Sequence, residues 1–292
     1  MTDVVSFDGT HLAVSTWGAE DAPLVVLVHG LGMSTSSWGE VPDRLAGTCR
    51  VVAYDLRGHA GSGPAGTGRY RLASHAADLA AVLDHVRRGG EQVTLVGHSL
   101  GGAILLEHVA TAGDGHVAGA VFAGSGGSAV TVPGLPAHGL PAPVGAVVRA
   151  AWLGLLLLGV RAGRRLRGWD AVTDRVSRRW AFAPHEPAEL VARARADFLA
   201  TRPRALAGTV LASISHDGQR LAPALTAPAV VVHGGQDNEV PDDDARRLLD
   251  ALPAGELVSL PRSGHMLPLT DPEVVAGQVA RLIRRTQQER TG

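Results

Sequence analysis

The sequence predicts an α/β fold with a mostly parallel central sheet, and the pattern of apolar residues is the main reason. Short apolar runs recur along the chain, and most are followed by Gly or polar residues and then by a helix-like segment. The runs are nearly continuous, which is typical of strands buried on both faces of a sheet, and the strand–helix rhythm favours parallel neighbours. Strands are therefore expected over residues 4–7, 11–16, 24–28, 51–54, 93–96, 117–123, 229–233 and 256–260.

Local signals place the turns and helices between these strands. Asp8-Gly9-Thr10 separates the first two strands and predicts a β-hairpin turn. The run Asp242–Asp244 is expected to cap a helix, and the arginine-rich C-terminal tail is expected to be a frayed, solvated end. The remaining helix-like segments predict helices over 74–88, 103–110, 203–215 and 273–285.

The alternation of strands and helices breaks after Gly124. From about Ser128 to Thr201 the chain has Pro- and Gly-rich stretches and arginine-rich amphipathic segments, but no strand-like run. We therefore expect a discontinuous core, residues 1–127 and 203–292, interrupted by a helical insertion at 128–202.

The composition indicates a well-packed chain and excludes several classes of chemistry. Of the 292 residues 45% are hydrophobic and 19% are charged, so a sizeable core can be buried. A net charge of −1 with dispersed basic residues argues against a nucleic-acid partner. Lysine is absent, which excludes Schiff-base and pyridoxal phosphate chemistry and a P-loop.

Neither the cysteine usage nor the apolar segments indicate export or membrane insertion. Cys49 is the only cysteine, so the fold contains no internal disulfide, and its thiol is expected to be packed beside a strand. The N-terminus lacks the basic head and apolar stretch of a secretory signal. The most apolar segment, 150–160, is shorter than the ~20 residues of a bilayer span. We therefore expect a cytoplasmic protein; the sequence does not predict its oligomeric state.

A candidate nucleophile stands between a predicted strand and a predicted helix. Gly97-His-Ser-Leu-Gly101 matches the pattern G-x-S-x-G. In this pattern the serine occupies a strained turn, and glycines flank it because a β-carbon there would clash with neighbouring backbone. Ser99 is therefore the expected nucleophile. A nucleotide-binding loop is excluded, because G-x-G-x-x-G is absent.

A serine hydroxyl needs a histidine as general base. Among 13 histidines His265 is the candidate, because it follows the last predicted strand, and loops at the carboxyl ends of such strands gather the chemistry. His29, His98 and His233 are interpreted as structural. No His cluster has metal-ligand spacing, so we expect no metal and no cofactor.

A carboxylate must orient the base. Asp237 follows the next-to-last predicted strand, and the order Ser99, Asp237, His265 is the one expected for this architecture. Glu239, close by, and Asp55, after the fourth strand, are the alternatives.

Two backbone N–H groups are expected to form an oxyanion hole. Leu100 follows the nucleophile at the start of the predicted helix, and Leu31 lies between glycines in the loop after the third strand. Flanking glycines would let that loop turn towards the site.

Together these motifs resemble the α/β-hydrolase superfamily on both sides of the insertion. The resemblance implies a mostly parallel eight-stranded α/β-hydrolase sheet flanked by helices, with residues 128–202 as an all-helical cap. It carries the family's nucleophile, acid and base onto Ser99, Asp237 and His265, and its oxyanion amides onto Leu31 and Leu100. Ala60 departs from the Gly usual in its stretch and is expected to alter only the packing of its loop. The matching segments are 29–30, 50–62, 97–102, 234–237 and 264–265.

Within the superfamily, the segment 50–84 looks most like enol-lactonases, simple esterases and cofactor-free haloperoxidases. A serine nucleophile argues against the similar epoxide hydrolases and haloalkane dehalogenases, which use aspartate. C–C bond hydrolases usually carry Asn where this chain has His98. The residues expected to contact the substrate are apolar: Trp38, Trp152, Trp169, Trp180 and Met266. The alternative for the tryptophans of the insertion is that they pack the insertion onto the core.

The sequence thus predicts a serine hydrolase that cleaves a carboxylic ester or lactone of a small, fairly hydrophobic substrate through an acyl-enzyme. An acyltransferase, thioesterase or cyclase that uses the same triad, with a thioester among its possible substrates, is the alternative among enzymes. A protein that only binds a small ligand is the alternative outside enzymes.

Overall fold

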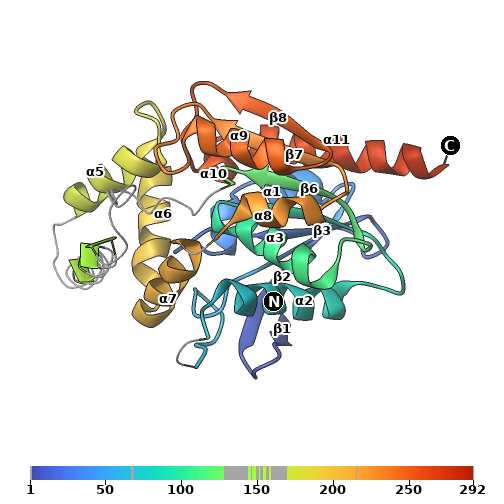
Figure 1. Cartoon of the computed structure of the whole chain (residues 1–292), viewed down its shortest axis with the longest axis horizontal. Coiled ribbons are helices and arrows are strands. Elements are labelled where there is room, and N and C mark those ends of the chain that lie inside the picture. Colours follow the sequence, from blue (N-terminus) through green and yellow to red (C-terminus); the bar gives the residue numbers. More distant parts are fainter. Residues whose placement is uncertain are drawn as a thin grey trace.

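An eight-stranded sheet with helices on both faces forms the centre of the molecule (Figure 1). The computed structural model describes residues 2–66, 69–127, 170–214 and 216–291, together with 144–145, 147–148, 151, 154–155 and 158. The spatial order is β1-β2-β4-β3-β5-β6-β7-β8. β2 pairs antiparallel with β1 and β4, and all other pairs are parallel. The strands are β1 Thr2–Val5, β2 His11–Trp17, β3 Leu24–Val28, β4 Arg50–Tyr54, β5 Val93–His98, β6 Val117–Ala123, β7 Ala229–Gly234 and β8 Gly255–Leu260.

The sheet divides the core into two layers, and β3 shows how. Alternate side chains of a strand point to opposite faces, so a strand buried on both faces is apolar throughout. Leu24, Val26 and Val28 belong to the layer under helices α2 (Leu72–Val86), α3 (Leu100–Ala112) and α9 (Asp242–Ala251). Val25 and Leu27 belong to the layer under α1 (Val41–Leu45) and α11 (Pro272–Thr291). All five residues are buried. The continuous apolar runs of the sequence are therefore explained by double-sided burial.

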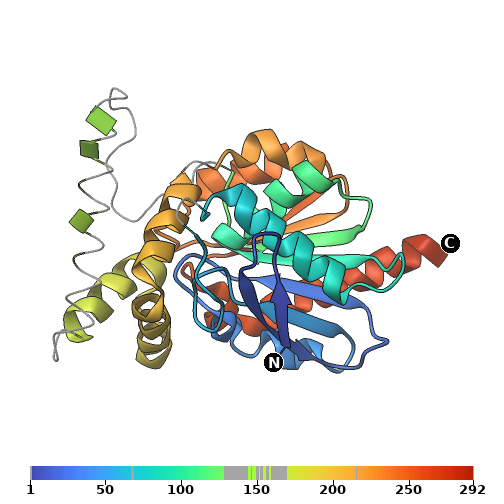
Figure 2. The same cartoon turned by 90° about the horizontal axis from the view of Figure 1, so that it is seen from below.

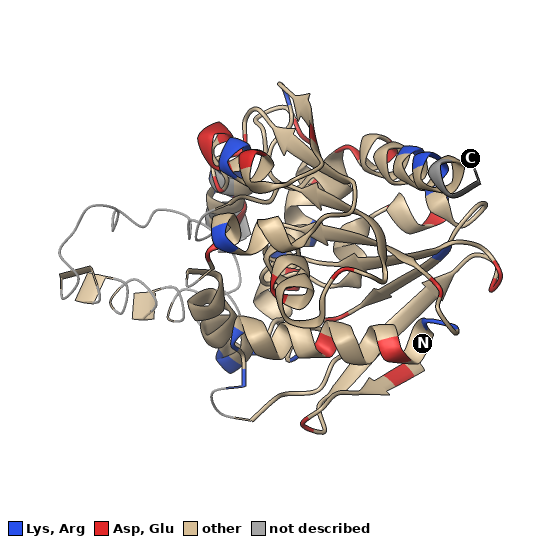
Figure 3. Ribbon diagram, turned by 45° about the vertical axis from the view of Figure 1, so that its right-hand side comes forward, with Lys and Arg blue, Asp and Glu red and all other residues tan. Residues whose placement is uncertain are grey.

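Among the described residues, helices α2, α3 and α9 pack on one face of the sheet, and helices α1 and α11 pack on the other. The bounds are α1 Val41–Leu45, α2 Leu72–Val86, α3 Leu100–Ala112, α5 Asp170–Ala181, α6 Ala188–Ala200, α7 Pro203–Ile214, α8 Gly218–Leu221, α9 Asp242–Ala251, α10 Leu267–Thr270 and α11 Pro272–Thr291, with short 3-10 helices η1 Thr35–Trp38 and η2 Ala222–Ala224. None of the helices in the described ranges has the length and apolar character to cross a bilayer. Figure 3 shows that acidic and basic residues are interspersed along the described part of the chain.

The predicted strands and helices are confirmed to within a few residues, with two corrections at helix ends. The C-terminal tail was expected to fray, but α11 continues to Thr291. Arg, Gln and Glu dominate this stretch and are good helix formers, and no Gly or Pro interrupts them before the last residue. The N-cap of α9 is Pro241 and not a residue of the acidic run. Asp242–Asp244 therefore lie in the first turn, where their negative charges interact favourably with the positive end of the helix dipole.

The described part of the segment predicted as an insertion contains helices α5 and α6 and bonds to the loop after β3. α5, α6 and α7 lie on the side of the molecule away from the C-terminus (Figures 1 and 2). Asp197 of α6 accepts hydrogen bonds from the hydroxyls of Ser34, at 2.8 Å, and Ser36, at 2.9 Å. Arg193 donates to the Ser36 carbonyl at 2.6 Å. The second half of the insertion is thus tied to a loop at the carboxyl edge of the sheet.

Cys49 is buried beside β4 and carries a free thiol, as the sequence predicted. Ala60, in the loop after β4, is one of two residues other than glycine with positive φ among those described, at +34°. A β-carbon in this region is strained by about 1–2 kcal/mol, and Ala60 is exposed, so it gains little from packing.

Replacing Ala60 by Gly is therefore expected to raise the free energy of unfolding by about 0.5–1 kcal/mol, after the entropy cost of glycine in the unfolded chain. Urea unfolding followed by circular dichroism measures it. The matched control is Ala19, an exposed loop residue without positive φ. Ala19→Gly is expected to lower the free energy of unfolding by about 0.4–1 kcal/mol. A loss for Ala60→Gly as large as that of Ala19→Gly would contradict the assigned strain.

Candidate active site

Ser99 stands in a sharp turn between β5 and α3, with φ +52° and ψ −119°. The glycines around it are required by contact distances. A β-carbon on Gly101 would lie 1.9 Å from the Val28 carbonyl oxygen, and one on Gly97 would lie 2.5 Å from the Gly102 nitrogen. Such distances are far below van der Waals contact, so no other residue fits at either position without a shift of the backbone. The spacing predicted from the sequence is thus explained by packing between the turn, β3 and α3.

Several hydrogen bonds hold Ser99 in its strained conformation. Its N–H donates to the Ala123 carbonyl at 3.0 Å, and its carbonyl accepts from Gly102 N–H at 2.9 Å and from the Ser125 hydroxyl at 3.0 Å. Strain of this kind persists only where surrounding structure fixes it, and it is typical of functional sites. The turn also places Ser99 at the N-terminus of α3, where the first N–H groups have no helical acceptor and the helix dipole favours negative charge.

His265 and Asp237 come from the loops after β8 and β7, and their side chains meet. The Nδ1 atom of His265 lies 2.8 Å from Oδ2 of Asp237, and both side chains are buried. The other carboxylate oxygen, Oδ1, accepts the N–H of Glu239 at 2.8 Å and of Val240 at 2.9 Å. With both carboxylate oxygens occupied, Asp237 is fixed as an acceptor and places the shared proton on Nδ1 of His265.

Close approach of the two loops makes this contact possible. A β-carbon on Gly234, the last residue of β7, would lie 2.1 Å from the Gly264 carbonyl oxygen. The loop that carries His265 is held further by Glu186, which lies between α5 and α6. One oxygen of Glu186 accepts Gly264 N–H at 2.9 Å and the other accepts Ala183 N–H at 2.7 Å. His265 N–H donates to the carbonyl of Ala181 at 3.0 Å.

Charge around His265 favours its protonated form. Burial disfavours the imidazolium, but the carboxylates of Asp237 and Glu239 outweigh burial and raise the pKa of His265 to about 9. Oε2 of Glu239 lies 3.4 Å from Nε2 of His265. Burial and the neighbouring Asp237 raise the pKa of Glu239, and the charge on His265 opposes that rise.

His98 contacts the backbone of His265. Its Nε2 lies 3.1 Å from the His265 carbonyl oxygen, and the two ring centroids are 5.0 Å apart. Burial, and in smaller part the charge on His265, lowers the pKa of His98 to about 3, so its ring is neutral. A neutral ring can donate its Nε2 proton to that carbonyl, which fixes the tautomer of His98 and supports the base loop.

The loop after β3, which carries Leu31, is held beside Ser99 by two buried histidines. His29 accepts the N–H of Leu56 on Nε2 at 2.9 Å, and its Nδ1 lies 2.8 Å from the Gly30 carbonyl oxygen. Gly32 N–H donates to Nε2 of His59 at 3.3 Å. Burial lowers the pKa of His29 to about 4 and that of His59 to about 3, so both rings are neutral and accept these bonds.

This loop approaches Ser99 closely. A β-carbon on Gly30 would lie 3.2 Å from the β-carbon of Ser99, so the segment before Leu31 lies beside Ser99. Leu100 is the first residue of α3. Leu31, next to Gly30, and Leu100, next to Ser99, therefore belong to two neighbouring segments at the carboxyl edge of the sheet.

Neither alternative to Asp237, Asp55 or Glu239, contacts Nδ1 of His265 in the way that Asp237 does. Asp55 accepts the N–H of Thr35 at 2.7 Å and that of Gly61 at 3.0 Å, so it joins the segments that follow β3 and β4. Glu239 contacts His265, but at Nε2 rather than at Nδ1. Glu186 and His59 were missed by sequence reasoning, because neither stands in a pattern that marks its contact with another loop.

The residues expected to contact substrate fall into three groups. Trp38 is fully buried in the core layer under α1 and α11. Met266, next to the candidate base, is buried in a small cluster with residues of the insertion, including Phe182 and Val191. Trp152, Trp169 and the side chain of Trp180 lie outside the described residues.

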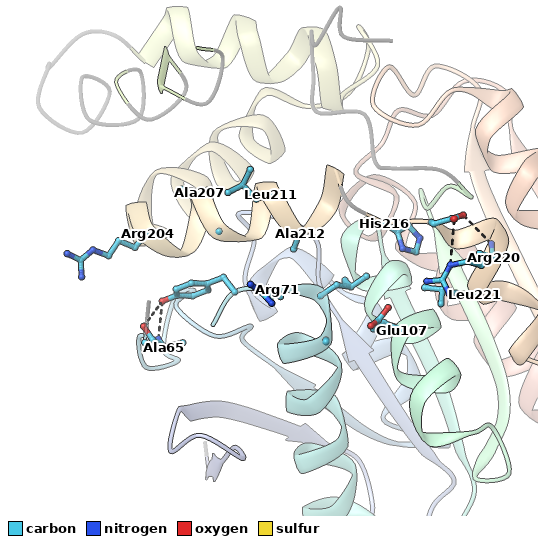
Figure 4. Close-up of a pocket in the computed structure, with 16 residues that line it drawn as sticks. Ala65, Arg71, Glu107, Arg204, Ala207, Leu211, Ala212, His216, Arg220 and Leu221 are labelled. Atoms are coloured by element: carbon cyan, nitrogen blue, oxygen red, sulfur yellow. Dashed lines mark hydrogen bonds and ion pairs between the residues drawn. The ribbon is translucent and has the colours of Figure 1, made fainter. Parts of the chain in front are cut away.

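A separate cavity of about 870 Å³ opens between α2, α3, α7 and α8 (Figure 4). Arg71, Glu107 and His216 line it, and Ser99, Asp237 and His265 do not. No group of three or more His, Cys, Asp or Glu in the described ranges has the geometry to hold a metal ion.

Comparison with known proteins agrees with this architecture. Residues 25–278 match the model of the alpha/beta hydrolase family. A non-heme chloroperoxidase of Streptomyces lividans is 34% identical over 152 residues, 52% of this chain and 54% of the relative, so the chain spans about half the length of that relative. An esterase from Exiguobacterium antarcticum has the same fold, with TM-score 0.80 at 21% identity over 97% of this chain and 99% of its own. An enol-lactonase from Burkholderia xenovorans also has this fold, with a TM-score of 0.76 at 22% identity over 97% of this chain and 100% of its own. The chain belongs to the alpha/beta hydrolase family.

Proposed function

We propose that this chain is a serine hydrolase that cleaves the carboxylic ester or lactone of a small, fairly hydrophobic molecule. The observation that carries the proposal is the 2.8 Å contact between His265 and Asp237, at the same edge of the sheet as the strained Ser99. The names of similar proteins, an esterase and an enol-lactonase, support an ester or lactone as the substrate class.

In the proposed reaction His265 accepts the hydroxyl proton of Ser99 on Nε2 while Ser99 Oγ attacks the substrate carbonyl. The N–H groups of Leu31 and Leu100 donate to the oxyanion that forms. His265 then gives its proton to the leaving oxygen, and the acyl-enzyme remains. Water, deprotonated by His265, attacks the acyl group. The bond from the acyl carbon to Ser99 Oγ then breaks, Ser99 takes the proton back from His265, and the acid is released. Asp237 stays ionised and stabilises the imidazolium in both halves of the cycle.

We also propose that residues 128–202 form a cap over this site. The contacts of Asp197 with the β3 loop and of Glu186 with the base loop support it, because both bind loops at the reacting edge. In this arrangement Met266, which packs against Phe182, would line the acyl or alcohol pocket.

Labelling with a fluorophosphonate tests the proposed nucleophile. Attack by Ser99 forms a P–O bond and releases fluoride, so we expect wild-type protein to gain the mass of one phosphonyl group and Ser99→Ala to gain none. Ser74→Ala, a change of a serine at the start of α2, is the control and should label like the wild type. An unlabelled wild type, or equal labelling of Ser99→Ala, would contradict the proposal.

A further inference from the structure

A second carboxylate, Glu239, lies at the nitrogen of His265 that Ser99 has to use. Oε2 of Glu239 is 3.4 Å from Nε2, while Asp237 is 2.8 Å from Nδ1. Both nitrogens of the candidate base therefore face a carboxylate. The mechanism above uses Asp237 and gives Glu239 no role.

The turn that fixes Asp237 also fixes Glu239. The N–H of Glu239 donates to Oδ1 of Asp237, so the two residues are parts of one hydrogen-bonded turn. Asn238, between them, donates from its side chain to the Arg179 carbonyl of α5 at 3.1 Å. The side chain of Glu239 is 20% exposed and that of His265 is 3% exposed, so this contact is screened little by solvent. The loop thus presents two carboxylates to one ring.

We propose that ionised Glu239 binds the protonated His265 at Nε2 in the resting protein and thereby competes with Ser99 for that nitrogen. This inference rests on the proposed roles of Ser99 and His265. An Nε2 that carries a proton and forms an ion pair with Glu239 has no lone pair with which to accept the proton of Ser99. The proton on Nε2 has to pass to solvent, and Glu239 has to release the ring, before Ser99 can be deprotonated. Glu239 is therefore a positioning residue that sets when the base is available.

Of the titratable groups around His265, Asp237 and Glu239 are the two that stabilise its protonated form. His98 on β5 and His233 on β7 lie near the ring, and burial lowers the pKa of each, so both are neutral and do not repel the imidazolium. Glu186, from the insertion, is engaged by the backbone of the base loop rather than by the ring. Asp242 lies 3.8 Å from His233 and pairs with Arg246 of α9 at 2.7 Å.

The pH dependence of fluorophosphonate labelling tests this role directly. In the wild type the labelling rate should rise with pH around a midpoint near 9, because only neutral His265 activates Ser99. In Glu239→Gln one of the two carboxylates is gone, and the midpoint is expected to fall by about one unit. Near neutral pH the variant should then label about tenfold faster than the wild type, and the two rates should converge at alkaline pH.

Two further variants separate the contact from general charge and folding effects. Asp243→Asn removes an exposed carboxylate on α9 that pairs with Arg247, and its profile should match the wild type. Glu239→Asp keeps the charge but shortens the side chain, so its midpoint should lie between those of wild type and Glu239→Gln. An unchanged midpoint in Glu239→Gln, or slower labelling at every pH, overturns the inference.

A measurement on the ring itself distinguishes failure of this inference from failure of the proposed function. The His265 imidazole can be titrated by ¹⁵N NMR, with its signals assigned by their loss in His265→Ala. We expect a lower midpoint of this titration in Glu239→Gln than in wild type. If no protein labels on Ser99 at any pH, the proposed function fails, and the NMR titration still decides whether Glu239 holds the imidazolium. If labelling occurs but both midpoints are unchanged, only the role of Glu239 fails.

Discussion

Replacing Asp237 by Asn is expected to lower kcat for ester hydrolysis about 10⁴-fold. The hydrogen bonds of the wild type give the reason. Oδ1 accepts two backbone N–H groups, so the single oxygen of the Asn amide would stay there and its NH₂ group would face Nδ1 of His265. Nδ1 would then be the acceptor and Nε2 would carry the proton. In that tautomer His265 cannot accept the proton of Ser99.

The measurement is steady-state hydrolysis of a short-chain nitrophenyl ester, with thermal unfolding to show that the variant is folded. Asp243→Asn makes the same chemical change on the exposed face of α9 and should keep the wild-type kcat. A kcat for Asp237→Asn within tenfold of the wild type would show that another carboxylate orients the base. Glu239 would then be the residue to examine, since it contacts the other nitrogen of the same ring.

Local signals in the sequence were sufficient for the sheet and for the strained turn at Ser99. The valine-rich runs of β3 and β5 predict strands buried on both faces, because only such strands are apolar at consecutive positions. Gly97 and Gly101 predict the turn at Ser99, because the same local geometry recurs wherever a strand enters a helix in this way. In each case the signal and the structure it specifies lie within about ten residues of each other.

The contacts between loops could not be predicted in this way. Asp237 and Glu239 are two residues apart, and sequence alone does not decide which reaches Nδ1 of His265. The choice follows from the turn in which Oδ1 of Asp237 accepts the N–H of Glu239, since this leaves Oδ2 towards the ring. Glu186 likewise reaches Gly264 across 78 residues of chain. Such pairings depend on how separate elements are placed by the fold, and no local pattern encodes them.

Arg57, in the loop after β4, is expected to contribute strongly to the stability of the fold. Its side chain is fully buried, and Nε and Nη2 donate to both oxygens of the equally buried Asp78 of α2, at 2.6 and 2.5 Å. Nη1 donates to Asp8 in the β1–β2 turn, at 3.0 Å, and to the Arg69 carbonyl, at 2.7 Å. One guanidinium thus joins the hairpin, the β4 loop and α2. The same loop carries His59, which accepts a bond from the segment beside Ser99.

Arg57→Met is expected to lower the free energy of unfolding by about 3–5 kcal/mol, because it leaves Asp78 buried without its cation. Urea unfolding measures this. Arg44→Met removes an arginine paired with Glu40 on the surface, with both side chains at least 40% exposed, and should cost about 1 kcal/mol or less.

The double variant Arg57→Met, Asp78→Leu identifies the source of that loss. If the cost is the uncompensated carboxylate, removing it should recover most of the lost free energy, since an apolar pair of similar volume often replaces a buried ion pair without loss. If the cost is the bonds of Nη1 to Asp8 and to the Arg69 carbonyl, the double variant should stay as unstable as Arg57→Met. Ester hydrolysis by the double variant adds a functional readout. Restored stability with reduced kcat would mean that Arg57 also holds the β4 loop in the position from which His59 supports Gly32.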